Sequence, residues 1–214
     1  MTKGPSRTSA RQRPSPNKAV PVGIGFRVHI GWATAVTVRD CPPSPLAIEK
    51  LQLSNPDVAE SLAPYHAAKG LDEPQRSHVV TRGAQAVRRR ALTVLKEVVA
   101  SRKSEGLSVE AVGVIRGSER SAEDLRSYAA NIHLGDADIF RDALSDAADE
   151  LSIRVVEETI DSFNALRLGK SGAEGADFSL DTKPKPWRSE EKAAALAGLV
   201  ALRVTTRAKS ATKS

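Results

Sequence analysis

Cysteine is nearly absent from this sequence of 214 residues, in which Cys41 is the single example. An internal disulfide and a cysteine-based zinc cluster are therefore excluded. Aromatic residues make up only 4% of the chain, so Ala, Val and Leu must supply most of a hydrophobic core. No apolar run reaches the roughly 18 residues of a membrane helix, and residues 1–20 lack the apolar segment of a signal peptide. We therefore expect a cytoplasmic protein with no membrane partner.

Acidic residues are missing from both ends of the chain. Residues 1–20 contain five Lys and Arg residues and residues 203–214 contain four, and neither segment has an Asp or Glu. All 26 acidic residues and the other 23 basic residues lie in 21–202, which leaves this central part with a net charge of −3. The overall net charge of +6 therefore arises at the ends and not in the centre.

The composition of the two ends predicts disorder, because segments rich in Ser, Pro, Thr and Arg cannot bury enough apolar surface to fold. We predict a single domain over residues 21–203, with disordered basic tails at 1–20 and 204–214. Such tails would either add weak, salt-sensitive affinity for nucleic acid or only keep the protein soluble.

Three strands are predicted at the start of the domain. The Val-, Ile- and Thr-rich stretch after residue 21 predicts strands at 22–28 and 32–39, with a tight turn at His29–Gly31 between them. Prolines favour a loop over residues 41–45, because proline removes a backbone donor. The alternation of apolar and polar residues in Ala47–Leu53 predicts the third strand, and three consecutive strands form an antiparallel meander.

The rest of the chain alternates helices and strands. A connection over 55–72 leads to a helix whose apolar residues recur at helical spacing from Val80 to Val98. After it we expect a strand at 109–115, helices at 122–132 and 138–151 separated by Gly135, a strand at 153–156 and a last helix at 189–203. The order β-β-β-α-β-α-β-α predicts an α/β protein with a mixed sheet and helices on both faces.

Two short motifs suggest a family. Gly23-Ile24 in the first strand is followed by Gly31-Trp32-Ala33, and with the order of elements this resembles the ribonuclease H-like superfold, in its Holliday-junction-resolvase-like branch. In that branch the first strand reads Gly-Ile-Asp-x-Gly and a Gly-Trp-Ala motif follows. The stretches Pro64–Ala68 and Pro186–Ala194 also resemble a set of uncharacterised bacterial proteins, which imply no function.

The resemblance implies chemistry that this chain is not equipped to perform. Nucleases of the family need three or four carboxylates around two metal ions, which activate water and stabilise the leaving oxygen. The position of the first-strand acid is Gly25 here, and the fourth strand ends in Arg116. Glu190 and Glu191 alone cannot hold two metals. Our leading hypothesis is therefore a non-catalytic domain that requires no cofactor and binds nucleic acid or a protein partner.

An alternative hypothesis is a hydrolase or nuclease with a rebuilt active site, which would use Mg or Mn. His133, Asp136 and Asp138 lie within six residues, and a histidine beside carboxylates can bind a metal or transfer a proton. His66, in the long connection, is the other candidate. The structural alternative is that Asp136 or Asp138 caps the following helix, with Asp138 paired to Arg141.

Several cationic and aromatic residues are candidates for binding nucleic acid or another ligand. Arg82, Arg89 and Lys96 recur every seven residues, either to follow phosphates or as the solvated face of a helix. Trp187 is either an anchor for the last helix or a stacking platform, and Lys192 and Arg141 are further candidates.

The stretch Gly113–Arg120 follows a strand and precedes a helix, a place where glycines can cradle a phosphate. It lacks the Gly-Lys-Ser/Thr pattern of a P-loop. A third hypothesis is one lobe of an actin-like nucleotide-binding protein, a family that usually has two such lobes.

Overall fold

A five-stranded mixed sheet forms the centre of the computed structural model, which describes residues 19–117, 128–167 and 187–211. The strands are β1 (Val20–His29), β2 (Trp32–Asp40), β3 (Pro43–Gln52), β4 (Leu107–Arg116) and β5 (Arg154–Thr159). Their order across the sheet is β3-β2-β1-β4-β5. β2 is antiparallel to both β1 and β3, whereas β4 is parallel to β1 and β5 is parallel to β4. The predicted mixed sheet, with its opening meander, is confirmed.

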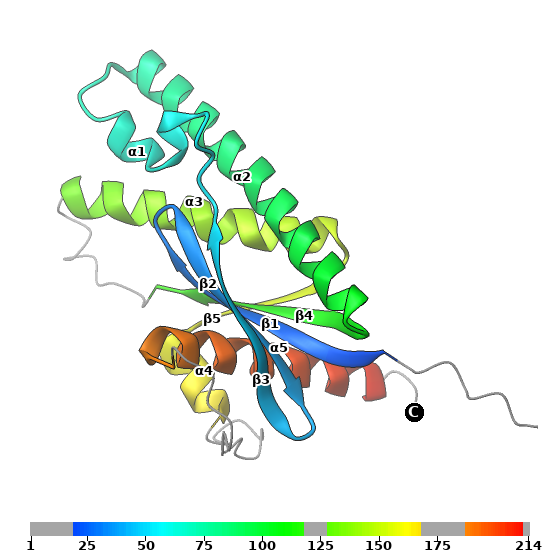
Figure 1. Ribbon diagram of the computed structural model, residues 1–214. Helices are drawn as coiled ribbons and strands as arrows, with labels where there is room; N and C mark the ends of the chain where they lie inside the picture. Colours follow the sequence, from blue (N-terminus) through cyan, green and yellow to red (C-terminus); the bar gives the residue numbers. More distant parts are fainter. Residues whose placement is uncertain (1–18, 118–127, 168–186, 212–214) are drawn as a thin grey trace, which may run out of the picture.

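Helices cover both faces of the sheet, as the order of elements predicted (Figure 1). The helices α2 (Glu73–Ser104) and α3 (Tyr128–Glu150) lie on one face, and α4 (Ile160–Arg167) and α5 (Ser189–Ala211) lie on the other. The short η1 (Ala59–Ser61) and α1 (Pro64–Ala67) lie beside the first turns of α2. Within the described residues, no helix is both long and apolar enough to cross a bilayer.

Local signals explain the extent of the long helix α2. Asp72 accepts a hydrogen bond from the backbone N–H of Gln75 at 3.0 Å, which caps the first turn, and proline occupies a position in that turn. Gly106 follows the last turn with φ +77°, a conformation that glycine adopts without strain. The face of α2 that carries Val87, Ala91 and Leu95 is buried against the sheet and α3.

Small aliphatic residues dominate the core, as the scarcity of aromatics predicted. The largest cluster lies between the sheet and the helices α2 and α3, and it contains Val, Ala and Leu with Ile24, Phe26 and Phe140. Two smaller clusters lie on the α5 face, one around Val36 and Leu199 and the other around Phe163.

Helix α5 packs directly onto the backbone of the sheet. A Cβ built at Gly25 would overlap the carbonyl oxygen of Ala194 and lie 2.8 Å from its carbonyl carbon. A Cβ built at Gly23 would overlap the carbonyl oxygen of Gly198, and one at Gly113 would lie 3.1 Å from the Cβ of Ala197. Glycine is therefore required at these positions because two backbones approach closely there.

The structure corrects several boundaries. Helix α3 runs without a break through Gly135, where an interruption was expected, and α4 was not predicted. Strand β3 begins at Pro43, inside the predicted loop, because an edge strand tolerates proline. Helix α5 continues to Ala211, so residues 204–211 are helical where a disordered tail was expected. Residues 1–18, 212–214, most of the helix expected at 122–132 and the stretch 118–120 lie outside the described residues.

Candidate functional site

Asp136 is a fully buried carboxylate that ties α3 to α1, with 0% of its side chain exposed. Its Oδ1 accepts a hydrogen bond from the backbone N–H of Tyr65 at 2.6 Å. Its Oδ2 lies 3.3 Å from the backbone nitrogen of His66 and 2.5 Å from His66 Nδ1. One carboxylate thus satisfies two backbone donors and one imidazole, which compensates for its burial.

The role of Asp136 differs from the predicted one, which was to cap its own helix. Residue 136 lies inside α3, so it has no helix start of its own to cap. The residue before α1, Ala63, has no side-chain cap, and Asp136 provides that function from another helix. Gly135 makes the close approach possible, because a Cβ there would lie 2.7 Å from Cε2 of the Tyr65 ring.

The docking of α1 brings His66 and His133 together. Their ring centroids are 6.1 Å apart and the rings are nearly perpendicular, at 87°. Because His66 Nδ1 faces Asp136, this nitrogen carries the proton in the neutral ring, and Nε2 is left as the acceptor. Asp138 does not join this cluster, since it pairs with Arg141 at 2.7 Å, as the structural alternative predicted. The His66–Asp136–His133 cluster is thus assembled from two helices that are far apart in sequence.

A cavity of about 440 Å³ adjoins this cluster and shares His133 with it. It lies at the carboxyl ends of β1 and β4 and at the start of α4, the edge at which open α/β sheets bind ligands. The lining residues come from these strand ends, from α3 and from α4: Arg27, Val28, His29, Ile30, Arg116, Gly117, His133, Leu134, Ala137, Arg141 and Ile160. Three of these described residues are arginines and none is acidic. We call this space the cationic cavity.

The alternation of side chains along β1 positions two of the cavity residues. Gly23, Gly25, Arg27 and His29 follow one another at every second position, so they share the face on which α5 lies. The helix packs on Gly23 and Gly25, and Glu190 in its first turn lies 3.1 Å from His29. Arg27 and His29, at this end of the strand, line the cavity.

Two of the cavity arginines are held in place by acids. Arg116 donates to Glu157 at 2.7 and 3.0 Å and to Asp142 at 2.6 Å. Burial alone would lower the pKa of Arg116, but the hydrogen bonds to these two carboxylates outweigh it and raise that pKa. Arg141 is 12% exposed and bonds to Asp138, while its buried Nε has no protein partner. These guanidinium groups are positively charged and oriented.

His29 reports the electrostatic environment at the rim of the cavity. Burial lowers its pKa, Glu190 opposes the shift, and the positive charges of Arg27, Lys50 and Arg141 add to the lowering. Glu190 Oε1 lies 3.1 Å from His29 Nε2, yet this nitrogen is not aligned for a hydrogen bond and has no such partner in the structure. We therefore regard this contact as a Coulombic one. His29 is neutral near pH 7 and also stacks on Trp32 at 4.1 Å.

The two-metal centre implied by the resemblance does not fit these residues. At Gly25 the backbone of α5 fills the place of a side chain. Arg116 is a cation at the end of β4, and Glu191, 8% exposed, accepts from the N–H of Arg188 as part of the start of α5. Across the described parts of the chain, no three His, Cys, Asp or Glu residues are grouped to hold a metal. The packing of α5 against Gly25 thus occupies the place where the resemblance implied an acidic side chain.

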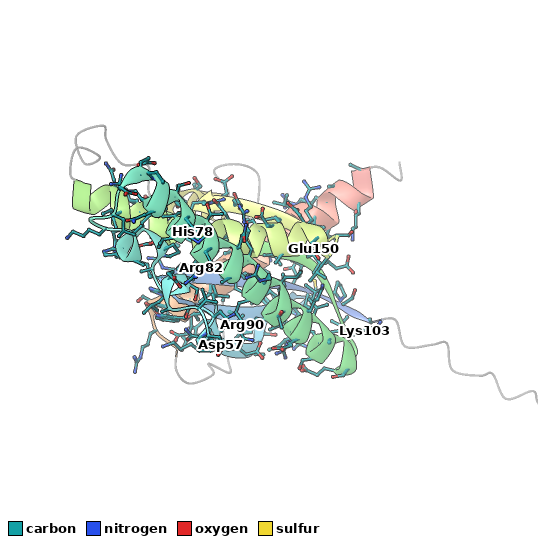
Figure 2. The ribbon with its side chains drawn as sticks, turned by 90° about the horizontal axis from the view of Figure 1, so that it is seen from above. Asp57, His78, Arg82, Arg90, Lys103 and Glu150 are labelled. Atoms are coloured by element: carbon teal, nitrogen blue, oxygen red, sulfur yellow. The ribbon has the colours of Figure 1, made fainter. Side chains whose placement is uncertain are left out.

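The other predicted binding residues lie outside the cavity, Arg141 excepted. Arg82 pairs with Glu60, and Lys96 lies 3.7 Å from Glu150 at the end of α3. Figure 2 shows Arg82 and Glu150 on this outer side of the molecule. Arg89 is exposed on α2 and Lys192 is exposed on α5.

Trp187 packs against the core beneath α5, which agrees with its predicted role as an anchor. The candidates along α2 do not line the cavity.

Arg27, His29 and Arg116 are cavity residues that were not among the predicted site residues. One sequence signal for this site is Arg116, which ends a predicted strand. It lies within Gly113–Arg120, the stretch whose glycines could cradle a phosphate. Arg27 gave a weaker signal, because its place in the cavity depends on elements that are distant from it in sequence.

The solved structures that this chain resembles include two of RuvC from Thermus thermophilus. One is Thermus thermophilus RuvC in complex with a Holliday junction substrate, 18% identical, covering 84% of this chain and 90% of that chain with a TM-score of 0.46. The other is a further T. thermophilus RuvC structure, 15% identical, covering 84% and 92% with a TM-score of 0.47. No family model matches, and no curated protein matches in sequence. The opening meander, the parallel crossovers and the helices on both faces are the arrangement that the ribonuclease H-like resemblance of the sequence implied.

Proposed function

We propose that this protein is a non-catalytic ribonuclease H-like domain that associates with nucleic acid in the cytoplasm. The observation that carries the proposal is the sign of the charge at the carboxyl ends of β1 and β4. Arg27, Arg116 and Arg141 line this place, whereas cleavage by the two-metal mechanism needs converging carboxylates there. Arginine forms strong, oriented hydrogen bonds to phosphate, so such a cavity favours binding to the nucleic-acid backbone.

The basic ends of the chain add to this proposal. Residues 1–20 carry five basic residues and no acid, and such a segment attracts phosphates without reading sequence. We therefore propose that two parts of the protein contact nucleic acid, namely the cationic cavity and the basic segment 1–20. Replacing Arg7, Arg11 and Arg13 with Gln should reduce the salt dependence of binding while leaving the cavity unchanged.

The test is an incubation of the full chain with labelled single-stranded, duplex and branched DNA, and with RNA. Each substrate is tested with Mg, with Mn and with a chelator, at low and at moderate salt. We expect salt-sensitive binding without cleavage under every condition. Metal-dependent cleavage would overturn the non-catalytic assignment. Failure to bind any of the polymers would overturn association with nucleic acid, and a protein partner would then be the remaining form of the proposal.

A hydrolase with a rebuilt site is the second candidate, and the His66–Asp136–His133 cluster favours it. Asp136 fixes the tautomer of His66, so that Nε2 is available to accept a proton as a general base. If a divalent metal assists, the two imidazoles are the ligands that this cluster offers to Mg or Mn. Such an enzyme would hydrolyse phosphodiester or phosphomonoester substrates, since the adjoining cavity is cationic.

The variants His66→Ala and His133→Ala test this second candidate, with Asp146→Ala, an exposed residue of α3 that pairs with Arg88, as the matched control outside the cluster and the cavity. Turnover of p-nitrophenyl phosphate and bis-p-nitrophenyl phosphate would be measured with and without Mn, alongside circular dichroism to verify the fold. If the cluster is catalytic, both histidine variants lose turnover and the control retains it. Equal turnover in all three variants, or none in the unmodified protein, would exclude the candidate.

A further inference from the structure

We propose that the cationic cavity binds the terminal phosphomonoester of a nucleotide unit, at the end of a nucleic-acid strand. This inference rests on the proposed association with nucleic acid, and it specifies which part of the polymer enters the cavity.

The first argument is charge. The lining contains Arg27, Arg116 and Arg141 and, among the described residues, no carboxylate. The acids that hold two of these arginines, such as Asp138 and Glu157, are not part of the lining. All three nitrogens of Arg116 donate to Glu157 or Asp142, so Arg116 contributes charge at the cavity wall. Arg141 donates to Asp138 through Nη1 and has more donors left for a ligand. A bound anion would accept from these donors.

The second argument is an incompletely satisfied guanidinium. Arg141 is largely buried, with one acid partner at 2.7 Å and a buried Nε that has no hydrogen-bond partner in the structure. A buried donor without a partner is unfavourable. An anion in the cavity would stabilise the positive charge of the Arg141 guanidinium.

The third argument selects a monoester over an internal diester. A terminal phosphate carries a charge between about −1.5 and −2 at pH 7 and three strong acceptor oxygens. An internal phosphodiester carries one charge and must continue on both sides, which suits an open groove. The cavity is instead bounded by β1, β4, α3 and α4 and has a volume of about 440 Å³. This geometry suits the end of a strand.

The fourth argument concerns the rest of the nucleotide unit. Val28, Ile30, Leu134 and Ile160 give the same cavity apolar walls. Its volume falls within the range of about 300–1,000 Å³ that is typical of small-ligand sites. Inorganic phosphate would leave these walls in water, whereas a sugar and base would cover them. We therefore expect a nucleoside phosphate to bind more tightly than inorganic phosphate.

The experiment measures binding of the full chain to one single-stranded oligonucleotide prepared with a 5′-phosphate, with a 3′-phosphate or with hydroxyls at both ends. Because the three probes share their internal phosphates, contributions from the basic ends of the protein are the same for each. We expect at least one phosphorylated probe to bind about ten-fold more tightly than the hydroxyl probe, the effect of one strong charge-assisted contact. Free nucleoside monophosphate should compete with it more effectively than inorganic phosphate.

Variants locate the preference in the cavity. Arg27→Ala and Arg141→Lys should abolish the preference for the phosphorylated end, the second because lysine lacks the guanidinium fork. Arg82→Ala and Lys96→Ala remove the same charge from the outer side of α2, and they should retain the preference. Thermal unfolding of each variant verifies the fold, and Arg27→Ala keeps the test decisive if a change at the more buried Arg141 destabilises the protein.

The outcomes separate this inference from the proposed function. Equal affinity for phosphorylated and hydroxyl ends, with binding to both, would overturn the inference and leave association with nucleic acid standing. Binding of free nucleoside monophosphate without binding of any oligonucleotide would support the cavity as a phosphomonoester site and overturn the proposed function. An unchanged end preference in Arg27→Ala and in a folded Arg141→Lys would overturn the cavity as its location.

Discussion

Helix α5 and helix α1 are both docked at glycines, but the two contacts differ in chemistry. α5 meets β1 backbone to backbone, where Gly25 lies against the carbonyl of Ala194. α1 meets α3 through the Tyr65 ring over Gly135 and through hydrogen bonds to the buried carboxylate of Asp136. The first contact is dry and contains no side chain at its centre, whereas the second is polar and contains an ionisable group.

The comparison shows where chemistry can reside in this fold. The dry contact occupies the place where a nuclease of the family carries its first acid, so no side chain can project there. The polar contact positions His66 near His133 and next to the cationic cavity. The groups proposed to be functional therefore lie at the strand ends and around α1, away from the closed centre of the sheet.

The largest effect is expected from Gly25→Asp, which introduces an acid at the position where the ribonuclease H-like resemblance implies one. A Cβ at residue 25 overlaps the backbone of Ala194, and backbone cannot move aside as a flexible side chain can. We expect a loss of more than about 4 kcal/mol of unfolding free energy, measured by urea denaturation. Metal-dependent cleavage should not appear in this variant.

Gly117→Ala is the matched control, because a Cβ at residue 117 meets only the Arg141 guanidinium, at 3.7 Å or more. Its stability should change by less than about 1 kcal/mol. A stable Gly25→Asp protein would show that α5 can move away from the sheet. The backbone contact of α5 would then be no more rigid than the polar contact of α1.

The second prediction concerns the polar contact. Asp136→Ala leaves the N–H of Tyr65 and the Nδ1 of His66 without their acceptor, so we expect a loss of about 2–4 kcal/mol. The exposed Asp146→Ala should lose no more than about 0.5 kcal/mol, because it breaks only an exposed pair with Arg88. Chemical denaturation measures both, and similar losses would contradict the assigned role of Asp136.

The third prediction tests the end of α5. Ending the chain after Arg203 removes the buried Thr205, the packing of Val204 and the hydrogen bond from Lys209 to Glu110. We expect a loss of about 1–3 kcal/mol from the apolar surface exposed and the helical turns lost. A chain ending at Ala211 serves as the control and should unfold like the full protein.

The same truncation should change the response to pH. Hydrogen bonds from Lys209 and then from Ser108 lower the pKa of Glu110 in the folded protein. A lowered carboxyl pKa stabilises the fold above the unfolded value of about 4.3, and this contribution is lost as the pH falls through the folded pKa. The stability difference between full and truncated chains should therefore narrow at acid pH. A difference independent of pH would indicate that packing alone is responsible.

The smallest effect is expected from Gly135→Ala, the counterpart of Gly25 in the polar contact. The obstacle is the far end of the Tyr65 ring, which is partly exposed and can shift. Alanine also favours a helix over glycine by about 1 kcal/mol. The two effects oppose each other, so thermal unfolding should show a change within about 1 kcal/mol. A loss as large as that of Gly25→Asp would mean that the two contacts are equally rigid.

Much of the architecture could be predicted because it follows from local patterns. Alternation in Ala47–Leu53 and helical spacing from Val80 to Val98 each depend on neighbours in sequence, and both elements are present. The break expected at Gly135 was wrong because a tertiary contact, the Tyr65 ring, explains that glycine. The end of α5 was wrong because its basic residues suggested a tail, although Thr205 is buried.

The candidate site could be predicted only in its parts. His66, His133 and Asp136 were identified by residue type, but their meeting depends on α1 docking onto α3 across about 70 residues of sequence. The cavity was missed because its residues come from four separate elements. Arg27 has no sequence neighbour that marks it as part of a site, and it joins the cavity because β4, α3 and α4 meet the end of β1 there.

The glycine packing under α5 has a consequence for descent. A lineage with this contact cannot acquire an acid at residue 25 through a single substitution if that change costs the predicted stability, because the backbone of Ala194 occupies the space. The helix would first have to move outward, through enlargement at Ala194 or Gly198, and that step offers no advantage by itself. The close packing of α5 on β1 therefore prevents an acid from appearing at residue 25. New activity on this scaffold is expected to arise at the strand ends.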